Sequence, residues 1–600
     1  MQITDRVMRR TGFFAATATL LIVLCGCPKG GGSGTSVPEG NSGASGTEKA
    51  TSVKSDMRFE EMTAQTGVNF TYRNGADAGE VAILESLGGG VGLFDFDNDG
   101  DLDLCLPGGG HYGEKDDAGL RPVLGWPHAI YRNEGDWKFT EVTQAATADV
   151  TPYYSHGAAA ADFDNDGFCD VLITGYGGLL LLRNHGDGTF EELAKTAGMI
   201  DEMWSSSAAW GDFNKDGSLD VYVAHYANWS FSFHPFCPGP KPGSRESCPP
   251  REFKGLPHTL YLSNGDGTFR DSSQESGLKP DGKGLGVLTA DLDLDGDVDV
   301  YIGNDTVANF LFRNDGTGKF EEVGLVSGTA LSQSGTPDGS MGVDVGDLNL
   351  DGKPDLWVAN FERESIALYR NDGNCLFQHV SQMMGVTAVG ALYVGWGTAI
   401  CDFDKDGDED SFVSNGHVIR YPENAPIFQK PLLFDNRNGK RLENASSTAG
   451  PYFSEGHQGR GSASGDIDRD GDIDLVISRL NQPVAFVSNT TEHSQHWLSL
   501  QLIGITSPRN PIGAIVRIKT ADREMVRQVK GGTSYASTID PALFIGLGGK
   551  ETVESISIQW PSGLIQTSGP LPGNQRWIVR EGQDAVPDQN SVRPPKSSKQ

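Results

Sequence analysis

Seven short acidic strings in the chain have the composition of metal-binding loops. Each fits the pattern D-x-[DN]-x-D-G-x-x-D, with oxygen-bearing side chains at alternate positions around one glycine. Carboxylates packed this closely repel one another unless a cation lies between them. The strings are DFDNDGDLD (95–103), DFDNDGFCD (162–170), DFNKDGSLD (212–220), DLDLDGDVD (291–299), DLNLDGKPD (347–355), DFDKDGDED (402–410) and DIDRDGDID (466–474).

Calcium is the cation that suits this pattern. It accepts six to eight oxygen ligands in irregular geometry, whereas magnesium demands stricter geometry and zinc prefers histidine and cysteine. The glycine at position 6 lets the chain turn back so that the flanking ligands converge. We therefore predict up to seven structural Ca²⁺ ions, held by positions 1, 3, 5 and 9 and by the main-chain carbonyl of position 7: Asp95, Asp97, Asp99, Asp101, Asp103, Asp162, Asp164, Asp166, Phe168, Asp170, Asp212, Asn214, Asp216, Ser218, Asp220, Asp291, Asp293, Asp295, Asp297, Asp299, Asp347, Asn349, Asp351, Lys353, Asp355, Asp402, Asp404, Asp406, Asp408, Asp410, Asp466, Asp468, Asp470, Asp472 and Asp474.

The strings are not EF-hands. An EF-hand closes its calcium site with a bidentate glutamate at position 12, and here position 12 is aliphatic in every string: Leu106, Ile173, Val223, Ile302, Val358, Val413 and Ile477. Strings 212–220 and 347–355 have asparagine at position 3 and a lysine nearby. We expect these two to bind calcium more weakly than the other five.

Short β-type segments surround each string, which predicts an all-β chain. A run of small or apolar residues precedes the string, a second run follows it, and two further segments separated by Gly/Asn/Asp turns complete the unit. Four short strands per unit are typical of a propeller blade, so seven units predict a seven-bladed β-propeller over 57–492. The seventh unit lacks its fourth segment, and 57–68 resembles one; the N-terminal segment should therefore complete the seventh blade. An open solenoid is the alternative.

The two ends of the chain have a different composition. Residues 1–27 read as a signal peptide that ends in LCGC, which resembles a bacterial lipobox with Cys27 as the lipidated residue. A Gly/Ser-rich tether follows over 28–56, and 583–600 reads as a disordered tail. These features predict an exported protein that is lipid-anchored at the bacterial cell envelope.

Cysteines and histidines outside the strings are candidates for disulfide pairing or catalysis. Cys237 and Cys248 bracket a Pro/Gly-rich loop and form a disulfide candidate, with two free thiols as the alternative. The sequence leaves open how the other cysteines pair: Cys105, Cys169, Cys375 and Cys401. The chain carries no recognisable catalytic motif, so we predict no catalytic residues. Ordinary loop residues are the expected interpretation of His111, His156, His234, His417 and His457. The net charge of −32 argues against nucleic acid as a partner.

The seven units resemble FG-GAP (VCBS) repeats of the integrin α-subunit type, through their acidic loop and LYxNxGDGxF core. After residue 496 the runs HWLSLQLIG, NPIGAIVRIKT and ISIQWPSG predict a small antiparallel β domain at 493–582. This domain resembles the ASPIC/UnbV family in its markers Gly513-Ala514, Gly531-Gly532, Tyr535, Gly546-Leu547-Gly548 and Trp560-Pro561-Ser562-Gly563. Together the two parts resemble the cartilage-acidic-protein-like family, which implies calcium binding and an adhesive or scaffolding role.

The expected function is recognition of a protein or glycan ligand at the cell envelope. In integrin-type propellers the longer loops opposite the calcium face meet ligands. By analogy the longest connections between second and third strands are candidates, at 107–127, 225–258 and 414–431. Insertions that merely shield the ring are the alternative interpretation of these loops. An extracellular enzyme acting on polysaccharide and a periplasmic assembly factor are the alternative functions.

Overall fold

The computed structural model describes residues 57–146, 150, 152–423, 425–492 and 494–588. In this part of the chain the regular structure is mainly β-strand, and the helices are single turns. The predicted signal peptide with Cys27, the tether 28–56 and residues 589–600 lie outside the described residues. Within them, no helix combines the length and apolar character that a membrane span requires.

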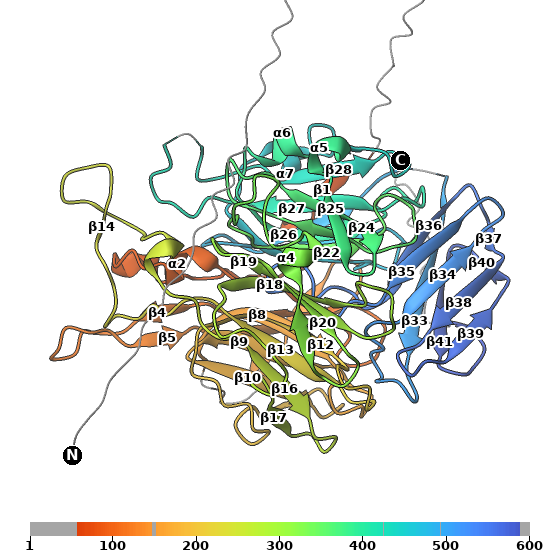
Figure 1. The fold of residues 1–600 in the computed structure, drawn as a ribbon, viewed down its shortest axis with the longest axis horizontal. Coiled ribbons are helices and arrows are strands. Elements are labelled where there is room, and N and C mark those ends of the chain that lie inside the picture. The colour runs from red at the N-terminus through yellow and green to blue at the C-terminus, as the bar shows by residue number, and fades with distance from the viewer. Residues whose placement is uncertain (1–56, 147–149, 151, 424, 493, 589–600) are drawn as a thin grey trace, which may run out of the picture. The chain divides into compact units, whose positions relative to one another are not determined.

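Seven four-stranded antiparallel sheets occupy the described residues before 490, one for each acidic string (Figure 1). From first to fourth strand they are β2 (Gly92–Phe94), β3 (Asp103–Leu106), β6 (Ala129–Asn133) and β7 (Phe139–Glu141) in sheet 1; β8 (Tyr154–Ala161), β9 (Asp170–Tyr176), β10 (Gly178–Asn184) and β11 (Phe190–Glu192) in sheet 2; β12 (Ser205–Gly211), β13 (Asp220–His225), β16 (Thr259–Ser263) and β17 (Phe269–Asp271) in sheet 3; β18 (Gly284–Ala290), β19 (Asp299–Asn304), β20 (Phe310–Asn314) and β21 (Phe320–Glu322) in sheet 4; β22 (Val343–Gly346), β23 (Asp355–Val358), β24 (Ala367–Gly373) and β25 (Leu376–His379) in sheet 5; β26 (Gly395–Cys401), β27 (Asp410–Asn415), β28 (Leu432–Asn436) and β29 (Leu442–Asn444) in sheet 6; and β30 (Gly459–Gly465), β31 (Asp474–Arg479), β32 (Ala485–Asn489) and β1 (Phe59–Glu61) in sheet 7.

The seven sheets form a propeller-like ring. The first strands of successive sheets contact one another in the order β2, β8, β12, β18, β22, β26 and β30, and β30 contacts β2 again. The N-terminal strand β1 completes sheet 7 by pairing with β32, with Phe59 opposite Asn489. The first strands are rich in glycine, alanine and serine, and such small residues let seven strands approach the centre together. The ring therefore closes with the N-terminal strand, as the sequence predicts.

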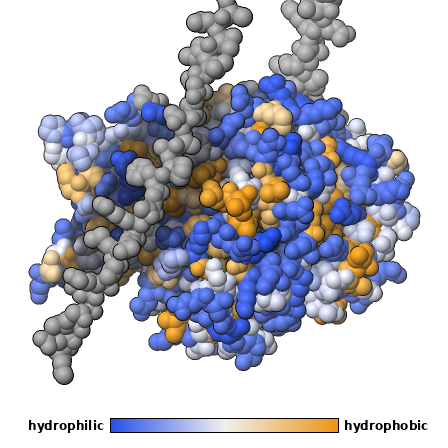
Figure 2. All heavy atoms as spheres, in the orientation of Figure 1, coloured by the Kyte–Doolittle hydropathy of each residue, from blue (hydrophilic) through white to orange (hydrophobic). Residues whose placement is uncertain are grey.

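Short connecting elements complete this part. Two-stranded pairs and single-turn helices lie in the connections: β4 (Gly110–Tyr112) with β5 (Val123–Gly125), β14 (Cys237–Pro238) with β15 (Arg245–Glu246), α1 (Thr63–Thr66), η1 (Ala76–Ala78), α2 (Leu84–Leu87), α3 (Thr143–Ala146), η2 (Pro250–Glu252), α4 (Gly324–Ser327), α5 (Ser381–Met384), α6 (Thr387–Gly390) and α7 (Pro451–Ser454). The face drawn in Figure 2 is mostly hydrophilic, and hydrophobic residues form separate groups on it.

The C-terminal strands, drawn in blue in Figure 1, form a β domain of two four-stranded sheets and one short pair. The sheets are β36 (Leu543–Gly548), β33 (His496–Ile503), β41 (Gln575–Arg580) and β42 (Val586–Pro587), and β35 (Glu524–Gln528), β34 (Ile515–Lys519), β38 (Ser555–Gln559) and β39 (Ile565–Ser568), with β37 (Thr552–Val553) paired to β40 (Leu571–Pro572).

Two features of this domain differ from the sequence-based prediction. The domain is not wholly antiparallel, because β33 and β41 pair in parallel. Its ordered part also extends beyond residue 582, into the segment predicted as a disordered tail. Val586 pairs with Ile578, and the Asp588 N–H donates to the Arg576 carbonyl at 3.0 Å. These ladder bonds hold a segment whose polar composition resembles that of a disordered tail.

The segment 531–540, between β35 and β36, passes through the centre of the ring. It hydrogen-bonds to the first strand of every sheet, through Leu93, Ala158, Trp210, Thr289, Val343, Thr398 and Ser464. For example, the Leu93 N–H donates to the Thr538 carbonyl at 3.0 Å, and the Trp210 N–H donates to the Gly531 carbonyl at 3.1 Å. Only a segment at the centre can reach seven strands arranged in a ring, so we call 531–540 the central segment.

Candidate metal centres

Each acidic string lies in the same place in its sheet, as the turn between the first and second strands. The residue before position 1 ends the first strand and pairs with the aspartate at position 9, which begins the second strand. This register holds in all seven sheets: Phe94–Asp103, Ala161–Asp170, Gly211–Asp220, Ala290–Asp299, Gly346–Asp355, Cys401–Asp410 and Gly465–Asp474. The strings are therefore equivalent sites at one end of the strands.

Backbone hydrogen bonds fold each string around its glycine. In the fourth sheet the Gly296 N–H donates to Asp291 Oδ2 at 2.9 Å, and Gly296 has a left-handed φ of 93° that favours glycine. The aspartate at position 9 closes the turn, because the Leu292 N–H donates to its Oδ2 at 3.0 Å and the Asn314 N–H to its Oδ1 at 2.9 Å. Asp299 thus ties the string to the third strand, and its carboxylate is fully buried.

The predicted ligands converge in the described strings. Carboxylate oxygens lie within 4.8 Å of one another in four of these clusters: Asp95, Asp97 and Asp99; Asp162, Asp164 and Asp170; Asp291, Asp293 and Asp295; and Asp402, Asp404 and Asp410. Oδ1 of the position-1 aspartate is buried without a hydrogen-bond partner in three strings, at Asp95, Asp402 and Asp466. Orphaned carboxylate oxygens at this depth fit a hard divalent cation as their missing partner.

The electrostatics of the strings also favour a bound cation. Burial, together with the neighbouring carboxylates, raises the pKa of Asp95 and of Asp291 from 3.8 to about 7. The pKa of Asp406 rises to about 7 for the same reasons. Without a cation these groups are costly to ionise near neutral pH. A Ca²⁺ ion would compensate this cost, and positions 1, 3, 5, 7 and 9 are the residues that would hold it.

The strings also contact one another around the ring through position 4, which has a left-handed φ near 60° in each of them. Lys405 Nζ lies 2.7 Å from Asp472 Oδ1, and Arg469 Nη1 lies 3.5 Å from Asp101 Oδ1. Lys215 pairs in the same way with Asp297. In each pair a basic residue at position 4 meets an acid at position 7 of the next string. Position 7 therefore has two roles. Its side-chain carboxylate pairs with the neighbouring string, and its main-chain carbonyl is the predicted cation ligand.

These links were not predicted from the sequence. The signal was present in the order of the strings, since Lys or Arg at position 4 precedes an acid at position 7 of the following one. In strings 95–103 and 162–170, whose following strings have no acid at position 7, an asparagine at position 4 reaches the backbone of the next string instead. Asn98 Nδ2 donates to the Gly167 carbonyl at 3.0 Å, and Asn165 Nδ2 donates to the Gly217 carbonyl at 3.1 Å.

Basic side chains of the C-terminal domain reach several strings. Arg576 Nη2 donates to Asp466 Oδ2 at 2.8 Å, and Arg523 Nη1 donates to Asp408 Oδ1 at 2.8 Å. Arg509 Nε lies 3.3 Å from Asp162 Oδ2. Strings 402–410 and 466–474 are consequently more buried than 95–103. The C-terminal domain therefore packs on the end of the ring that carries the strings.

Two details modify the expected ligand sets. In string 347–355 the Lys353 Nζ lies 2.8 Å from Asp351 Oδ2, so the lysine competes with a cation for that ligand. In string 291–299 the thiol of Cys375 joins Asp293 and Asp299 in a cluster within 4.8 Å. Cys375 comes from the turn before β25 of the next sheet, so its place beside these aspartates could not be predicted from sequence spacing. All four cysteines whose pairing was left open are free thiols.

In six of the seven sheets, an asparagine at the end of the third strand hydrogen-bonds to the preceding sheet. Asn314 Nδ2 donates to the Val298 carbonyl at 3.0 Å in its own sheet and to the Phe213 carbonyl of sheet 3 at 2.9 Å. The same bond to the preceding sheet recurs at Asn133, Asn184, Asn371, Asn436 and Asn489. Sheet 3 differs, because Ser263 occupies this position in the register. The asparagine of its sequence motif, Asn264, lies one residue later.

Replacing one of these asparagines should destabilise the ring. We expect Asn314→Ala to lower the free energy of unfolding by about 2–3 kcal/mol, because it leaves two buried carbonyls without donors. The control is Ser263→Ala, at the equivalent position of sheet 3. It should lower the free energy of unfolding by less than about 1 kcal/mol. Chemical denaturation of both variants measures the difference, and equal losses would show that the bond between sheets contributes nothing.

The raised pKa values predict how pH acts on the calcium-free protein. Asp95 and Asp291 have a pKa of about 7 when folded and about 3.8 when unfolded, so the folded state binds protons more tightly. Stability from these groups is complete below pH 4 and is lost as pH rises toward 7. We expect the melting temperature in chelator to fall from pH 5 to pH 8. Calcium keeps the carboxylates ionised, so in calcium buffer this fall in melting temperature should disappear. A fall of the same size in calcium and in chelator would contradict the assignment of the strings as calcium sites.

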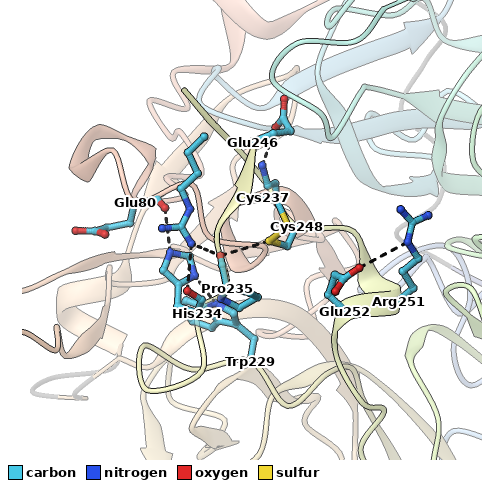
Figure 3. Close-up of a disulfide and its surroundings, with 11 residues drawn as sticks. Glu80, Trp229, His234, Pro235, Cys237, Glu246, Cys248, Arg251 and Glu252 are labelled. Atoms are coloured by element: carbon cyan, nitrogen blue, oxygen red, sulfur yellow. Dashed lines mark hydrogen bonds and ion pairs between the residues drawn. A yellow bond between two sulfur atoms is a disulfide. The ribbon is translucent and has the colours of Figure 1, made fainter. Parts of the chain in front are cut away.

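The three long connections lie at the other end of the strands, because they join second strands to third strands. In 225–258 a disulfide joins Cys237 and Cys248. Figure 3 shows Trp229 and His234 beside it. Trp229 Nε1 donates to His234 Nδ1 at 3.0 Å, and the opposite ring nitrogen of His234 donates to the Glu80 carbonyl at 3.0 Å. The connection is therefore fastened to the N-terminal part of the ring.

The five histidines considered from the sequence each lie against a local partner. His156 receives a hydrogen bond from Trp204 Nε1 at 2.9 Å, and His457 stacks on Tyr452 with ring centroids 4.2 Å apart. His111 packs against Trp126, and His417 lies 3.6 Å from Glu362. A sixth histidine, His225, pairs with Asp201 at 2.7 Å, and both side chains are fully buried. These contacts are those of structural histidines.

Two known families match the ring and the C-terminal domain separately. Residues 123–173, 162–223, 257–302, 291–358 and 347–413 match the FG-GAP-like repeat, and 504–586 match the family described as ASPIC and UnbV. The chain is an FG-GAP-like repeat protein with an ASPIC and UnbV domain. Strings 95–103 and 466–474 fall outside the matched ranges, but they share the register and hydrogen bonds of the others. The repeat of this FG-GAP-like protein therefore extends to both ends of the ring.

The FG-GAP-like protein is similar to cartilage acidic protein 1 of two animals. The Xenopus tropicalis protein is 24% identical over 518 residues, which span 81% of this chain and 72% of that protein. The Homo sapiens protein is 24% identical over 535 residues, or 82% of this chain and 71% of that protein. A solved structure of an Agrocybe aegerita lectin aligns with 67% of this chain and 94% of its own, at 14% identity and a TM-score of 0.37.

Proposed function

We propose that this chain is a calcium-stabilised recognition module, exported and lipid-anchored at the bacterial cell envelope, without catalytic activity. The observation that carries the proposal is the arrangement around the ring. The C-terminal domain packs on the strings and sends the central segment through the ring, so both places are occupied by the chain itself. The long connections at the opposite end remain for an external ligand. Loops held by a rigid scaffold commonly carry binding residues.

Exposed aromatic side chains support this choice of surface. In the long connections Phe233, Phe236, Tyr421 and Phe428 are between 46% and 62% exposed, although aromatic residues are usually buried in soluble proteins. They lie in 225–258 and 414–431, two of the candidates named from the sequence. Large exposed aromatics gathered on connections of one end are typical of surfaces that bind a partner.

Binding to the cell envelope tests the proposal. The purified full chain should retain an envelope protein or glycan in the presence of calcium and release it in chelator. A double variant, Phe233→Ala with Phe236→Ala, should bind more weakly at unchanged melting temperature, whereas Leu325→Ala, another exposed apolar position outside these connections, should bind normally. No retention with calcium would refute the proposal, and release of sugar fragments from envelope polysaccharide would favour the enzyme alternative.

Lipid anchoring has its own test. We expect Cys27→Ser to move the chain from the membrane fraction to the soluble fraction, because serine cannot form the thioether to the lipid. The control is Cys25→Ser, two residues earlier in the same signal, and this variant should stay in the membrane fraction. Fractionation of cells that express each variant measures the distribution, and the same location for both would contradict lipidation at Cys27.

A further inference from the structure

A cavity of about 400 Å³ lies among the connections at the end opposite the strings. Its lining comes from 74–86, from 417–421 with 427 and 428, from Ser247 and from residues flanking strands of sheet 7. Gln458 directly precedes β30, and Leu480 directly follows β31, whereas string 466–474 joins the other ends of these strands. The cavity is therefore separated from the strings by the length of a sheet and cannot share their cations.

The lining of the cavity combines apolar side chains with polar groups whose charges balance. Arg420 Nη2 lies 3.2 Å from Glu85 Oε2, and the Glu85 side chain is buried. Asn481 Nδ2 donates to Asn74 Oδ1 at 2.9 Å, which fixes both amides. Among the described residues the side-chain amide of Gln458 has no hydrogen-bond partner within the protein. The lining thus offers planar amide and guanidinium groups without a net charge, which suits a neutral ligand rich in hydroxyl groups.

Two aromatic residues of the lining, Tyr421 and Phe428, are 48% and 49% exposed. An exposed aromatic ring beside planar polar groups presents two kinds of contact together. The apolar C–H face of a sugar ring packs on the aromatic ring, and its hydroxyls hydrogen-bond to amide and guanidinium groups. One sugar ring can make both contacts at once, because its C–H face is apolar and its edge carries hydroxyls.

The disulfide-bearing connection fixes the shape of this cavity. The Arg420 N–H donates to Glu246 Oε1 at 3.1 Å, and the Tyr421 N–H donates to Glu246 Oε2 at 3.0 Å. Glu246 lies in β15 opposite Cys237, whose disulfide to Cys248 closes the loop. Figure 3 shows Glu246 beside the two cysteines. The backbone that carries Arg420 and Tyr421 is therefore held in place before any ligand binds, which lowers the cost of ordering it.

We propose that this cavity binds the terminal sugar of a neutral glycan. The inference rests on the proposed recognition function and specifies the ligand class and the binding residues. Tyr421 and Phe428 would stack on the sugar ring, and Gln458 and Arg420 would hydrogen-bond to its hydroxyls. The cavity volume lies within the range typical of small-molecule sites, roughly 300–1,000 Å³, so it accommodates the end of a glycan chain while the remainder extends into solvent.

Calorimetric titration of the full chain with soluble oligosaccharides tests the inference. The probes are neutral gluco-, manno- and N-acetylglucosamine oligosaccharides, with an alginate oligosaccharide as the acidic comparison, all in calcium buffer. We expect at least one neutral oligosaccharide to bind, and Tyr421→Ala and Gln458→Ala each to weaken it by about tenfold. Leu325→Ala is the control, because this residue is 70% exposed, lies outside the long connections and does not line the cavity, so this variant should bind normally.

The outcomes separate this inference from the proposed function. Absence of binding to every neutral oligosaccharide, or binding that Tyr421→Ala and Gln458→Ala leave unchanged, would overturn the glycan site. If the chain still retained an envelope protein in calcium, the recognition function would stand without the glycan inference. If it retained nothing, both would fail. Circular dichroism and melting curves of the variants confirm that weaker binding does not reflect unfolding.

Discussion

Chelation of divalent cations should lower the melting temperature of the full chain by about 10 °C. At free calcium roughly tenfold above a dissociation constant, each site contributes about 1.4 kcal/mol to the free energy of unfolding. Extracellular modules bind calcium with dissociation constants of about 10⁻⁴–10⁻³ M, so millimolar calcium reaches this regime. Five to seven such sites sum to about 7–10 kcal/mol, which for a domain of this size corresponds to a shift of that order.

Differential scanning calorimetry in calcium and in EGTA measures this shift. Asp291→Asn removes one charge from string 291–299 and should reduce the calcium-dependent part of the shift, while Asp281→Asn, an exposed position outside the strings, should leave it unchanged. Magnesium in place of calcium should restore little of the lost stability, because the ligand sets are large and irregular. A melting temperature that is the same in calcium and in EGTA would contradict a structural role for the cation.

Substituting Gly90 with alanine should destabilise the protein by about 3 kcal/mol. A Cβ atom at this position would lie 1.6 Å from the Ala536 carbonyl oxygen of the central segment, a distance that no packing adjustment of side chains can relieve. Either the first strand of sheet 1 or the central segment must move. Both hydrogen-bond to their neighbours through the backbone, so the displacement also weakens the bonds that join the segment to the ring.

Gly549→Ala provides the matched control. Gly549 is exposed in the C-terminal domain, and a Cβ atom there meets no neighbour within 4 Å, so we expect a change within about 0.5 kcal/mol. Hydrogen exchange distinguishes a local from a general effect: the Leu93 and Ala158 amides donate to the central segment and should lose protection in Gly90→Ala. Unchanged stability and unchanged protection would show that the central segment is not required by the ring.

The fold was readable from the sequence because its signals are local and repeated. The glycine at position 6 and the aspartates at positions 1 and 9 specify one tight turn, and seven copies define the strand register of seven sheets. The missing fourth segment of the last unit and the spare segment at 57–68 predicted how the ring closes, and β1 does pair with β32. Composition and periodicity sufficed because each sheet contacts mainly its neighbours.

Contacts between distant parts of the chain could not be predicted from these local patterns. The motif around Gly531 and Tyr535 marked a family, but nothing in its composition indicated that it would bond to all seven first strands. The same holds for Cys375 beside Asp293 and for Arg576 on Asp466. The C-terminal boundary was missed because β42 is held by ladder bonds rather than by an apolar pattern. Such features depend on which surfaces meet, which a single sequence does not encode locally.

The number of calcium ions that the full chain binds is the most direct test of the seven strings as calcium sites. Titration of calcium into chelator-treated protein, followed by calorimetry and checked by elemental analysis after dialysis, counts the ions that bind. We predict about five to seven ions per chain, with the five strings that have aspartate at position 3 filling before 212–220 and 347–355. Binding of fewer than five ions, or uptake that Asp291→Asn leaves unchanged, would contradict the assignment of the strings as calcium sites.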